Sequence, residues 1–217
     1  MAASRRFGFL GWAFGAGSEK ICYACLEPLG EGRILDEDGR AFCGSCASKR
    51  LADRDTLLEL WKRVRGYTRV RLRLRVPPAT LHELSPVALG RQLGVEWTGG
   101  VERALAQTQV NPMRSAILIE SGLPIDLASE VLAHEVGHLW FAHYGDSGAG
   151  ENMIEGFPQW VAYGFCRESG LRAQMDRILH RPSTMGRGVR QLVNLERQKG
   201  RDAVIGVAKA RPGRTPR

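Results

Sequence analysis

Apolar side chains recur at helical spacing in two stretches of the chain. The first follows Asp53 or Asp55, either of which is a suitable N-cap, and its apolar residues share one face. These residues are Leu57, Leu58, Trp61 and Val64. The second stretch runs from Ile125 to about His143, where apolar residues cover much of the helix surface. The pattern predicts one amphipathic helix and one helix that is substantially buried.

Alternating and short apolar runs predict strands elsewhere. The stretch "RVRLRLRVPP" at residues 69–78 alternates arginine with valine or leucine, which predicts a half-buried strand that ends at Pro77-Pro78. Its arginine face could be a docking strip for an acidic partner, although a solvated face that resists edge pairing is the simpler interpretation. Two more strands are predicted at residues 101–110 and 114–120, after a short helix that begins at Ser85-Pro86 and ends at Gly94.

The composition fits one sizeable core with a small satellite. Of the 217 residues, 43% are hydrophobic and 25% are charged. The net charge of +8 comes almost entirely from arginine, and basic residues cluster at positions 62–75 and 199–217. Such a balance suits nucleic acid, an anionic surface or an acidic protein, but genome composition produces it too. We therefore expect no nucleic-acid partner.

The apolar runs are too short to cross a membrane, so neither a membrane span nor a membrane partner is expected. The first residues, with Arg5, Arg6 and a short apolar stretch, imitate a signal peptide weakly, but glycines interrupt the apolar part. We interpret residues 1–19 as a flexible N-terminal arm and expect a cytoplasmic protein.

Four cysteines have the spacing of a tetrahedral zinc site, in two C-x-x-C pairs separated by seventeen residues. They are Cys22, Cys25, Cys43 and Cys46. Strand-like runs at residues 33–35 and 40–42 flank an Asp38-Gly39 turn, which completes the pattern of a zinc ribbon. Two disulfides in a secreted domain are the alternative. Cys166 has no evident partner and is interpreted as a buried core thiol.

The predicted buried helix contains "HEVGH", which places His134, Glu135 and His138 together. Two histidines four residues apart differ by about 40° around the helix axis, so both imidazoles can reach one ion. Glu135 would lie beside that ion and take a proton from water as it attacks a peptide carbonyl. This is the H-E-x-x-H motif of zinc peptidases. Two histidines satisfied by core hydrogen bonds are the alternative interpretation.

A peptidase site needs a third metal ligand. The metzincin extension is excluded, because Phe141 and Tyr144 stand where its glycine and histidine should be. His143 is one residue off and is interpreted as an exposed helix-end residue. A glutamate from a following helix is the remaining possibility, and either Glu155 or Glu151, which lies closer to the intervening loop, could supply it.

The segment "ENMIEGFPQWVAYGFC" fits a buried helix with Pro158 near its beginning. Gln159 lies on the same face as Glu155, where it could hydrogen-bond a ligand imidazole or make an ordinary helix contact. Four residues are candidate donors to the oxyanion of the transition state: Tyr144, Tyr163, His180 and Arg190. An extended substrate could pair with an edge strand at residues 108–109 or 117–120.

These segments carry a resemblance to a known family. "ILIESGLPIDLASEVLAHEVGHLWFAHYG", followed by "IEGFPQWVAY", resembles the peptidase domain of the DA-one-like proteins, which are LIM-associated, ubiquitin-activated zinc peptidases of the gluzincin type. Upstream, "ICYACLEPLGEGRILDEDGRAFCGSC" is similar to the zinc-binding module that precedes that domain. The resemblance covers roughly residues 20–165, and less securely "GRGVRQL" around Arg190.

The resemblance implies a division of roles among the site residues. His134, His138 and Glu155 would be the metal ligands, Glu135 the catalytic acid and base, and a protein the substrate. Plant members are regulated through a LIM domain and ubiquitin-interacting motifs. This chain has one four-cysteine site and no acidic ubiquitin-interacting helix before it, which makes ubiquitin activation doubtful.

The sequence therefore predicts an α+β protein, in which a small four-cysteine zinc ribbon precedes a mostly helical, zincin-like metallopeptidase domain with a small sheet. The expected divisions are the arm (1–19), a LIM-like ribbon (20–50), the peptidase domain (51–210) and a basic disordered tail (211–217). Two Zn²⁺ ions are expected, one catalytic and one structural, with a protein or peptide as substrate. The alternative is a catalytically silent ribbon protein that binds a protein partner or nucleic acid through its arginine-rich strand and tail.

Overall fold

The computed structural model describes residues 5–10, 21–30, 34–36, 39–94, 104–111, 114–181 and 183–209. It confirms the mixed α+β class, with small sheets, many helices and a four-cysteine cluster near the N-terminus. None of the described helices combines the length and the apolar composition of a membrane span. The predicted tail at 211–217 lies outside the described residues, as does most of the predicted arm.

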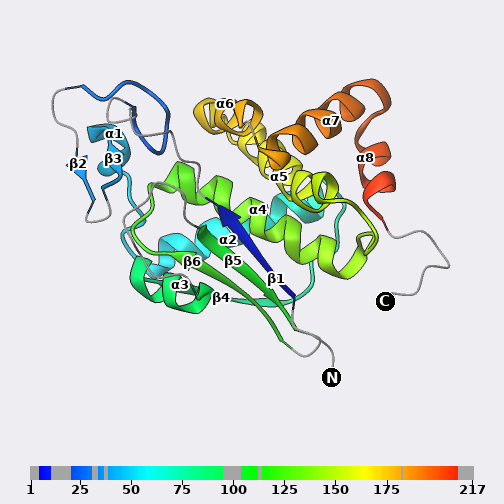
Figure 1. The fold of residues 1–217 in the computed structure, drawn as a ribbon, viewed down its shortest axis with the longest axis horizontal. Coiled ribbons are helices and arrows are strands. Elements are labelled where there is room, and N and C mark those ends of the chain that lie inside the picture. Colours follow the sequence, from blue (N-terminus) through cyan, green and yellow to red (C-terminus); the bar gives the residue numbers. More distant parts are fainter. Residues whose placement is uncertain are drawn as a thin grey trace.

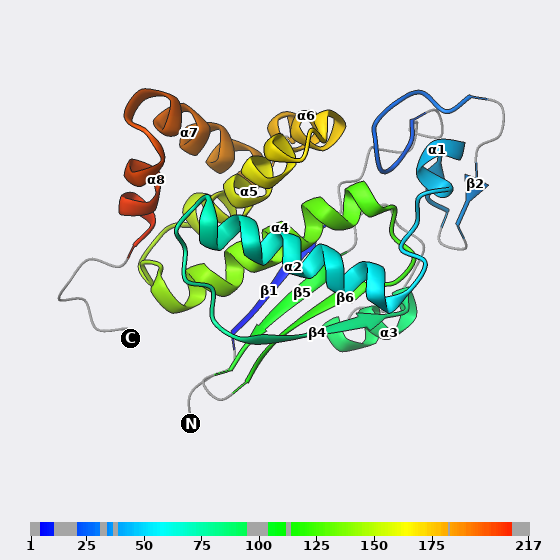
Figure 2. The same cartoon turned by 180° about the vertical axis from the view of Figure 1, so that it is seen from behind.

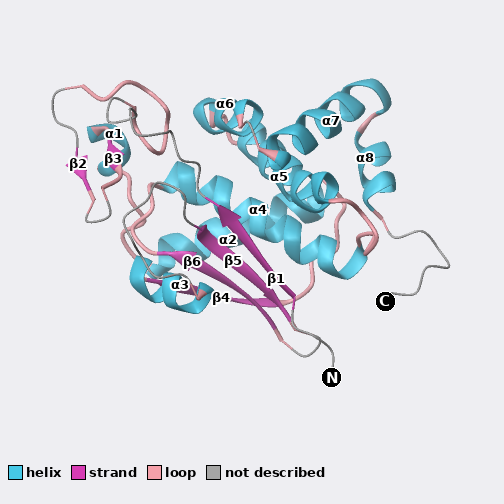
Figure 3. Cartoon of the chain, viewed as in Figure 1, coloured by secondary structure: helices cyan, strands magenta, loops and turns pink. Residues whose placement is uncertain are grey.

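Fourteen helices and strands are described. In chain order they are β1 (Arg5–Leu10), β2 (Ile34–Leu35), β3 (Ala41–Phe42), α1 (Gly44–Ala47), α2 (Arg54–Val70), β4 (Ala79–Leu84), α3 (Pro86–Leu93), β5 (Ala104–Val110), β6 (Ser115–Glu120), α4 (Ile125–Tyr144), α5 (Glu151–Glu168), α6 (Arg172–His180), α7 (Thr184–Lys199) and α8 (Arg201–Ala208). Figure 1 shows the sheet on one side of α4 and helices α5 to α8 on the other side. Figure 3 separates the same parts by secondary structure.

Four strands form the main sheet, in the order β1-β5-β6-β4. β5 pairs antiparallel with both β1 and β6, whereas β4 and β6 run parallel.

The sheet shows that two predictions are wrong. Residues 5–10 form a strand in place of part of a flexible arm, and the two predicted edge segments, at 108–109 and 117–120, lie in the inner strands. The long-range partners of β5 and β6 cannot be read from their own sequences, which explains the error.

Helices α2 and α4 lie on the same side of the sheet, as Figures 1 and 2 agree. α4 packs on β5 and β1, α5 packs on α4, and α7 packs on α5. The described residues form one continuous hydrophobic core, which includes apolar side chains from the sheet and from these helices. The predicted buried helix is confirmed, because fifteen consecutive residues of α4, from Leu127 to Phe141, are buried.

The arginine-rich stretch does not form the predicted strand. α2 continues to Val70, and residues 71–78 follow it without regular secondary structure. The amide of Leu74 donates to the Thr68 carbonyl, so the chain turns back along the end of the helix. Exposure still alternates after the helix, since Leu72 and Leu74 are buried between exposed arginines. A helix that had already begun at Asp53, its confirmed N-cap, outcompeted the strand pattern.

Other local predictions hold with small changes. Ser85 caps α3, and Gly94 ends it with a positive φ of 71°. β2 and β3 lie within the predicted ribbon hairpin, whose Arg33 and Asp38 are outside the described residues. Pro158 lies two turns inside α5, further from its beginning than predicted. α5 continues through it, although proline has no N–H to donate to the Ile154 carbonyl and its ring crowds that carbonyl.

Candidate metal centres

The first centre is built on α4. His134 and His138 lie one turn apart on this helix, and both side chains are fully buried. Their rings are 4.6 Å apart between centroids and nearly perpendicular, at 81°. Burial is the main cause that lowers the pKa of His134 well below its usual value, and the neighbouring His138 and Arg181 lower it further. His134 is therefore neutral near pH 7, which is the form that binds metal.

Glu155 reaches this histidine pair from α5. Its Oε2 lies 3.4 Å from His138 Nε2 and 3.8 Å from His134 Nε2. Ligand atoms about 2.0–2.1 Å from one tetrahedral ion lie roughly 3.3 Å from each other, so these separations suit a shared ion. Oε2 is buried and accepts no hydrogen bond within the described residues. Glu151, the competing candidate, is exposed at the first residue of α5.

A close helix crossing brings Glu155 to the histidines. At Gly137, a Cβ atom would lie 2.5 Å from Pro158 Cα and 3.0 Å from Pro158 Cβ. The backbone of α5 thus rests directly on the glycine between His134 and His138. Small residues permit such close approach of two helices, and the three candidate ligands depend on it.

Glu135 is fully buried and contacts the sheet. The Thr108 hydroxyl on β5 lies 2.6 Å from Glu135 Oε2, to which it donates a hydrogen bond. The bond fixes the orientation of the carboxylate beside the histidine pair. Thr108 was predicted only as part of a substrate-binding edge, and its contact with α4 depends on how the sheet packs.

Gln159 is fully buried, one turn after Glu155 on α5. It lies close enough to His134 for its amide to raise the pKa of that imidazole, in opposition to burial. Neither amide atom makes a hydrogen bond of ordinary geometry within the described residues. Its position is that of a group that orients a ligand imidazole.

Two of the four predicted oxyanion donors, Tyr144 and Tyr163, lie along their helices away from the ligands. Tyr144 is 41% exposed and packs on Trp140, and it follows His138 by six residues, about 9 Å along the helix. Tyr163 follows Glu155 by eight residues, about 12 Å along α5, and its ring lies under Arg167.

The other two candidate donors are tied to backbone carbonyls. The exposed His180 is bonded through Nδ1 to the Asp176 carbonyl. Arg190 donates to the carbonyls of Leu179 and Arg181 and so holds the connection between α6 and α7. These contacts do not test their predicted role as oxyanion donors, which stays a prediction.

The second centre gathers the four cysteines. One sulfur from each of Cys22, Cys25, Cys43 and Cys46 lies within 4.8 Å of the others. Cys25 Sγ and Cys43 Sγ are 3.8 Å apart, which is about the edge of a tetrahedron with metal–sulfur bonds of about 2.3 Å. All four are free thiols, so the disulfide alternative is wrong. Cys166 is also free and fully buried, as predicted.

Short contacts among the thiols favour a thiolate at Cys22. Its pKa is lowered to about 4, chiefly by a hydrogen bond from the Cys46 thiol. The same contact raises the pKa of Cys46, while burial raises that of Cys25 to about 12. Backbone N–H groups at Cys43 and Cys46 point at the sulfurs of Cys22 and Cys43. The Cys46 contact lies within its own C-x-x-C pair, as in a metal-binding knuckle, and the Cys43 contact joins the two pairs, so the residues present fit an ion.

Comparisons of the chain with known proteins found no relative. No family model, no curated protein and no solved structure matches the chain. The chemistry of the two centres consequently rests on their own atoms: four thiols in one, and two imidazoles with a carboxylate in the other.

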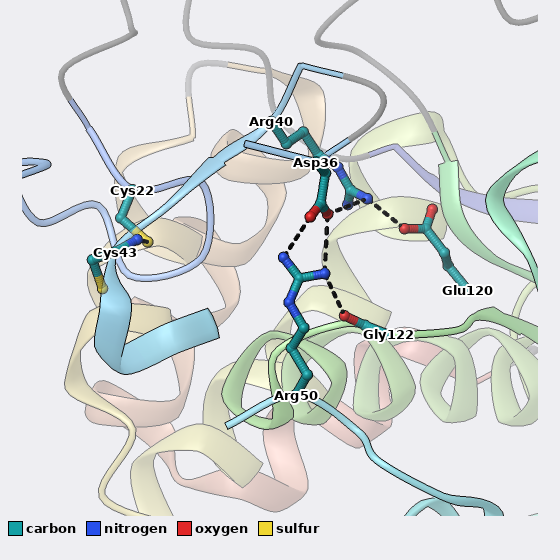
Figure 4. Close-up of polar contacts among 7 residues, drawn as sticks. All are labelled: Cys22, Asp36, Arg40, Cys43, Arg50, Glu120 and Gly122. Carbon is teal, nitrogen blue, oxygen red and sulfur yellow. Dashed lines mark hydrogen bonds and ion pairs between the residues drawn. The ribbon is translucent and has the colours of Figure 1, made fainter. Parts of the chain in front are cut away.

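A charged network joins the segment that carries the four cysteines (residues 21–50, the cysteine module) to the rest of the chain, as Figure 4 shows. Arg40, beside β3, donates to Glu120 at the end of β6 over 2.6 Å, and both side chains are buried. Asp36 bridges Arg40 and Arg50, and Arg50 also donates to the Gly122 carbonyl. Just beyond this point the backbones meet, because Ile125, the first residue of α4, donates to the Lys49 carbonyl. The module thus caps the beginning of the helix that carries the histidines.

A second buried cluster joins the module to the same helix. Glu130, one turn before His134, lies 3.3 Å from Arg177 and 3.9 Å from Arg181. Arg177 also donates to the Tyr23 carbonyl, and Gln174 donates to the Ala24 carbonyl. Sequence reasoning missed this cluster, since an acid on a predicted helix and two distant arginines carry no local signal.

The Arg40–Glu120 contact predicts a measurable stability change. Arg40→Met should lower the free energy of unfolding by about 2 kcal/mol, because the Glu120 carboxylate stays buried after its guanidinium partner is removed. The double variant Arg40→Met/Glu120→Met should recover most of the loss. Urea denaturation followed by circular dichroism measures both. Equal stability of the single variant and the wild type would contradict a buried ion pair at this junction.

Proposed function

We propose that this chain is a zinc-dependent metallopeptidase that hydrolyses peptide bonds in proteins or peptides. The observation that carries the proposal is the convergence of His134, His138 and Glu155, from two helices, beside the buried carboxylate of Glu135. Two imidazoles and one carboxylate are the donor set of many catalytic zinc sites, which keep a position for water or substrate. The resemblance of these segments to DA-one-like, zincin-type peptidases supports the same activity.

The protein side chains have separate roles in this proposal. Zinc in such a site lowers the pKa of water and acts as a Lewis acid toward a carbonyl oxygen. Glu135 takes the proton from the attacking water and returns it to the leaving amine, while the Thr108 hydroxyl holds its carboxylate in place. Gln159 orients the His134 ring, and neutral His134 is ready to bind the ion without losing a proton.

Both metal centres have a role in this proposal. The four cysteines hold a structural zinc ion that stabilises the module, which in turn fixes the beginning of α4 through Lys49 and Arg50.

The substrate is expected to bind along β1, which is an outer strand of the sheet and packs on α4. An extended peptide pairing with β1 would therefore lie next to the catalytic helix, in place of the inner strands first predicted.

Counting metal ions tests the proposed centres. Elemental mass spectrometry of the purified protein should find two zinc ions per chain. His138→Ala should remove one of them, and Cys22→Ser should remove the other, because each variant deletes a ligand from a different group.

Two matched variants serve as controls for the metal count. His143→Ala changes an exposed histidine on the same helix, and Cys166→Ala changes a cysteine outside the cluster, so both should keep two ions. If the wild type holds one ion and His138→Ala leaves it in place, the catalytic centre does not exist.

A further inference from the structure

A basic groove lies between the second half of α2 and the chain segment that returns from its end. Figure 2 shows this segment leaving α2 and running toward β4 on the face opposite to that of Figure 1. The groove has a volume of about 700 Å³. Five of its lining residues are cationic: Lys62, Arg65, Arg69, Arg73 and Arg75. No residue of either metal centre lines it.

The turn after α2 creates this groove. The amides of Arg71 and Leu72 donate to the Tyr67 carbonyl, and that of Leu74 donates to Thr68. Between them, Arg73 has a positive φ of 53°, which reverses the chain so that residues 73–76 run beside the helix. Glycine adopts this conformation most easily, and an arginine there costs about 1 kcal/mol. The position carries a guanidinium in spite of that cost.

Most of the groove cations have no acidic partner among the described residues. Lys62 pairs with Glu59, but none of the four arginines forms an ion pair with a carboxylate in the described part of the chain. Arg65 lies over the Trp61 ring at 5.3 Å. Four like charges around one concavity repel each other, so an anionic ligand would relieve the repulsion as well as add contacts.

Helix stability alone does not explain this arrangement. Arg69, in the last turn of α2, interacts favourably with the helix dipole, but Lys62 and Arg65 precede that turn, and Arg75 lies beyond the helix. Helix stability does not explain Gly66 either. A glycine inside a helix costs about 1 kcal/mol relative to alanine, yet no atom lies within 4 Å of where its Cβ would be. Packing does not require glycine here, and its absent side chain leaves the groove open.

We propose that this groove binds an acidic segment of another protein in an extended conformation. Arg73 and Arg75 are alternate residues that both line the groove. The acids at alternate positions of an extended peptide are about 6.5–7 Å apart, so the two guanidiniums can meet two such acids. Each guanidinium can hold a carboxylate through two parallel bonds. Val76, which also lines the groove and is partly exposed, offers apolar contact to the residues between the acids.

The lining favours an acidic peptide over a nucleic acid. Single-stranded nucleic acids bind by stacking bases on exposed aromatic rings as well as by phosphate contacts. Trp61 is the one aromatic side chain among the described lining residues, and it is 8% exposed and lies under Arg65. The groove contains no residue of either metal centre, so a test of peptide binding there is independent of a test of the proposed peptidase activity.

Fluorescence anisotropy with a fluorescein-labelled octaglutamate peptide tests the proposal. The full-length wild type should bind this peptide and not an octaglutamine peptide. Arg69→Gln/Arg73→Gln should weaken binding about tenfold, on the basis of roughly 0.7 kcal/mol for each exposed ion pair. Gly66→Leu should weaken binding at least as much, because it fills the groove without changing the charge. Circular dichroism checks that each variant is folded.

A matched double variant separates the groove from net charge. Arg54→Gln/Arg187→Gln removes two exposed arginines from other parts of the surface and should bind the peptide as the wild type does. If this control weakens binding as much as the groove variants, or if the wild type does not bind octaglutamate, the proposal is wrong. Tighter binding of a labelled octadeoxynucleotide, lost in the groove variants, would also overturn it and identify a nucleic-acid surface.

Discussion

Replacing Glu135 with glutamine should reduce peptide hydrolysis by about 10²–10⁴-fold, which is the usual contribution of a general base. Glutamine has nearly the same size and can still accept a hydrogen bond from Thr108, so the fold should not change. It cannot take a proton from water. Because Glu135 is not among the three residues that converge on the ion, both zinc ions should be retained. Cleavage of a proteome-derived peptide library, followed by mass spectrometry, measures the loss.

Glu151→Gln is the matched control for this variant. It makes the same chemical change at an exposed glutamate, at the first residue of α5, and should leave hydrolysis unchanged. His138→Ala should abolish the same cleavages through loss of the ion. Cleavage by Glu135→Gln at the wild-type rate, with zinc retained, would exclude the proposed role of this carboxylate.

Gly137→Ala should destabilise the protein by about 3 kcal/mol and lower the zinc content of the histidine site. The new methyl group would lie 2.5 Å from Pro158 Cα, a backbone atom that cannot move without α5. Separating the helices moves Glu155 away from His134 and His138, so one added carbon affects both stability and metal binding. Chemical denaturation and elemental mass spectrometry measure the two effects.

The same substitution at Gly66 is expected to have the opposite sign. Gly66 is also inside a helix, but its Cβ would meet no atom within 4 Å. Gly66→Ala should therefore stabilise the protein by about 1 kcal/mol through helix propensity. If Gly137→Ala were as stable as the wild type, α4 and α5 would not be in contact at this crossing.

Local chemistry explains which structural predictions succeeded. Ser85, Asp53 and Gly94 begin or end helices through bonds and backbone angles that involve only their neighbours. The burial of α4 followed from its own apolar composition. The strand predicted at residues 69–78 failed because two periodic patterns overlap there, and the helix that began at Asp53 extended through the first of these residues.

By itself, the sequence determined the two histidines and the four cysteines as candidate ligands, since a one-turn histidine spacing and paired C-x-x-C knuckles depend on local geometry. Only the tertiary structure decided between Glu155 and Glu151, because the choice depends on the crossing of α4 and α5 at Gly137. It likewise decided that the cysteine module supports α4 and that arginines from two segments line one groove. These contacts join residues far apart in the chain, and no local spacing encodes which distant surfaces will pack together.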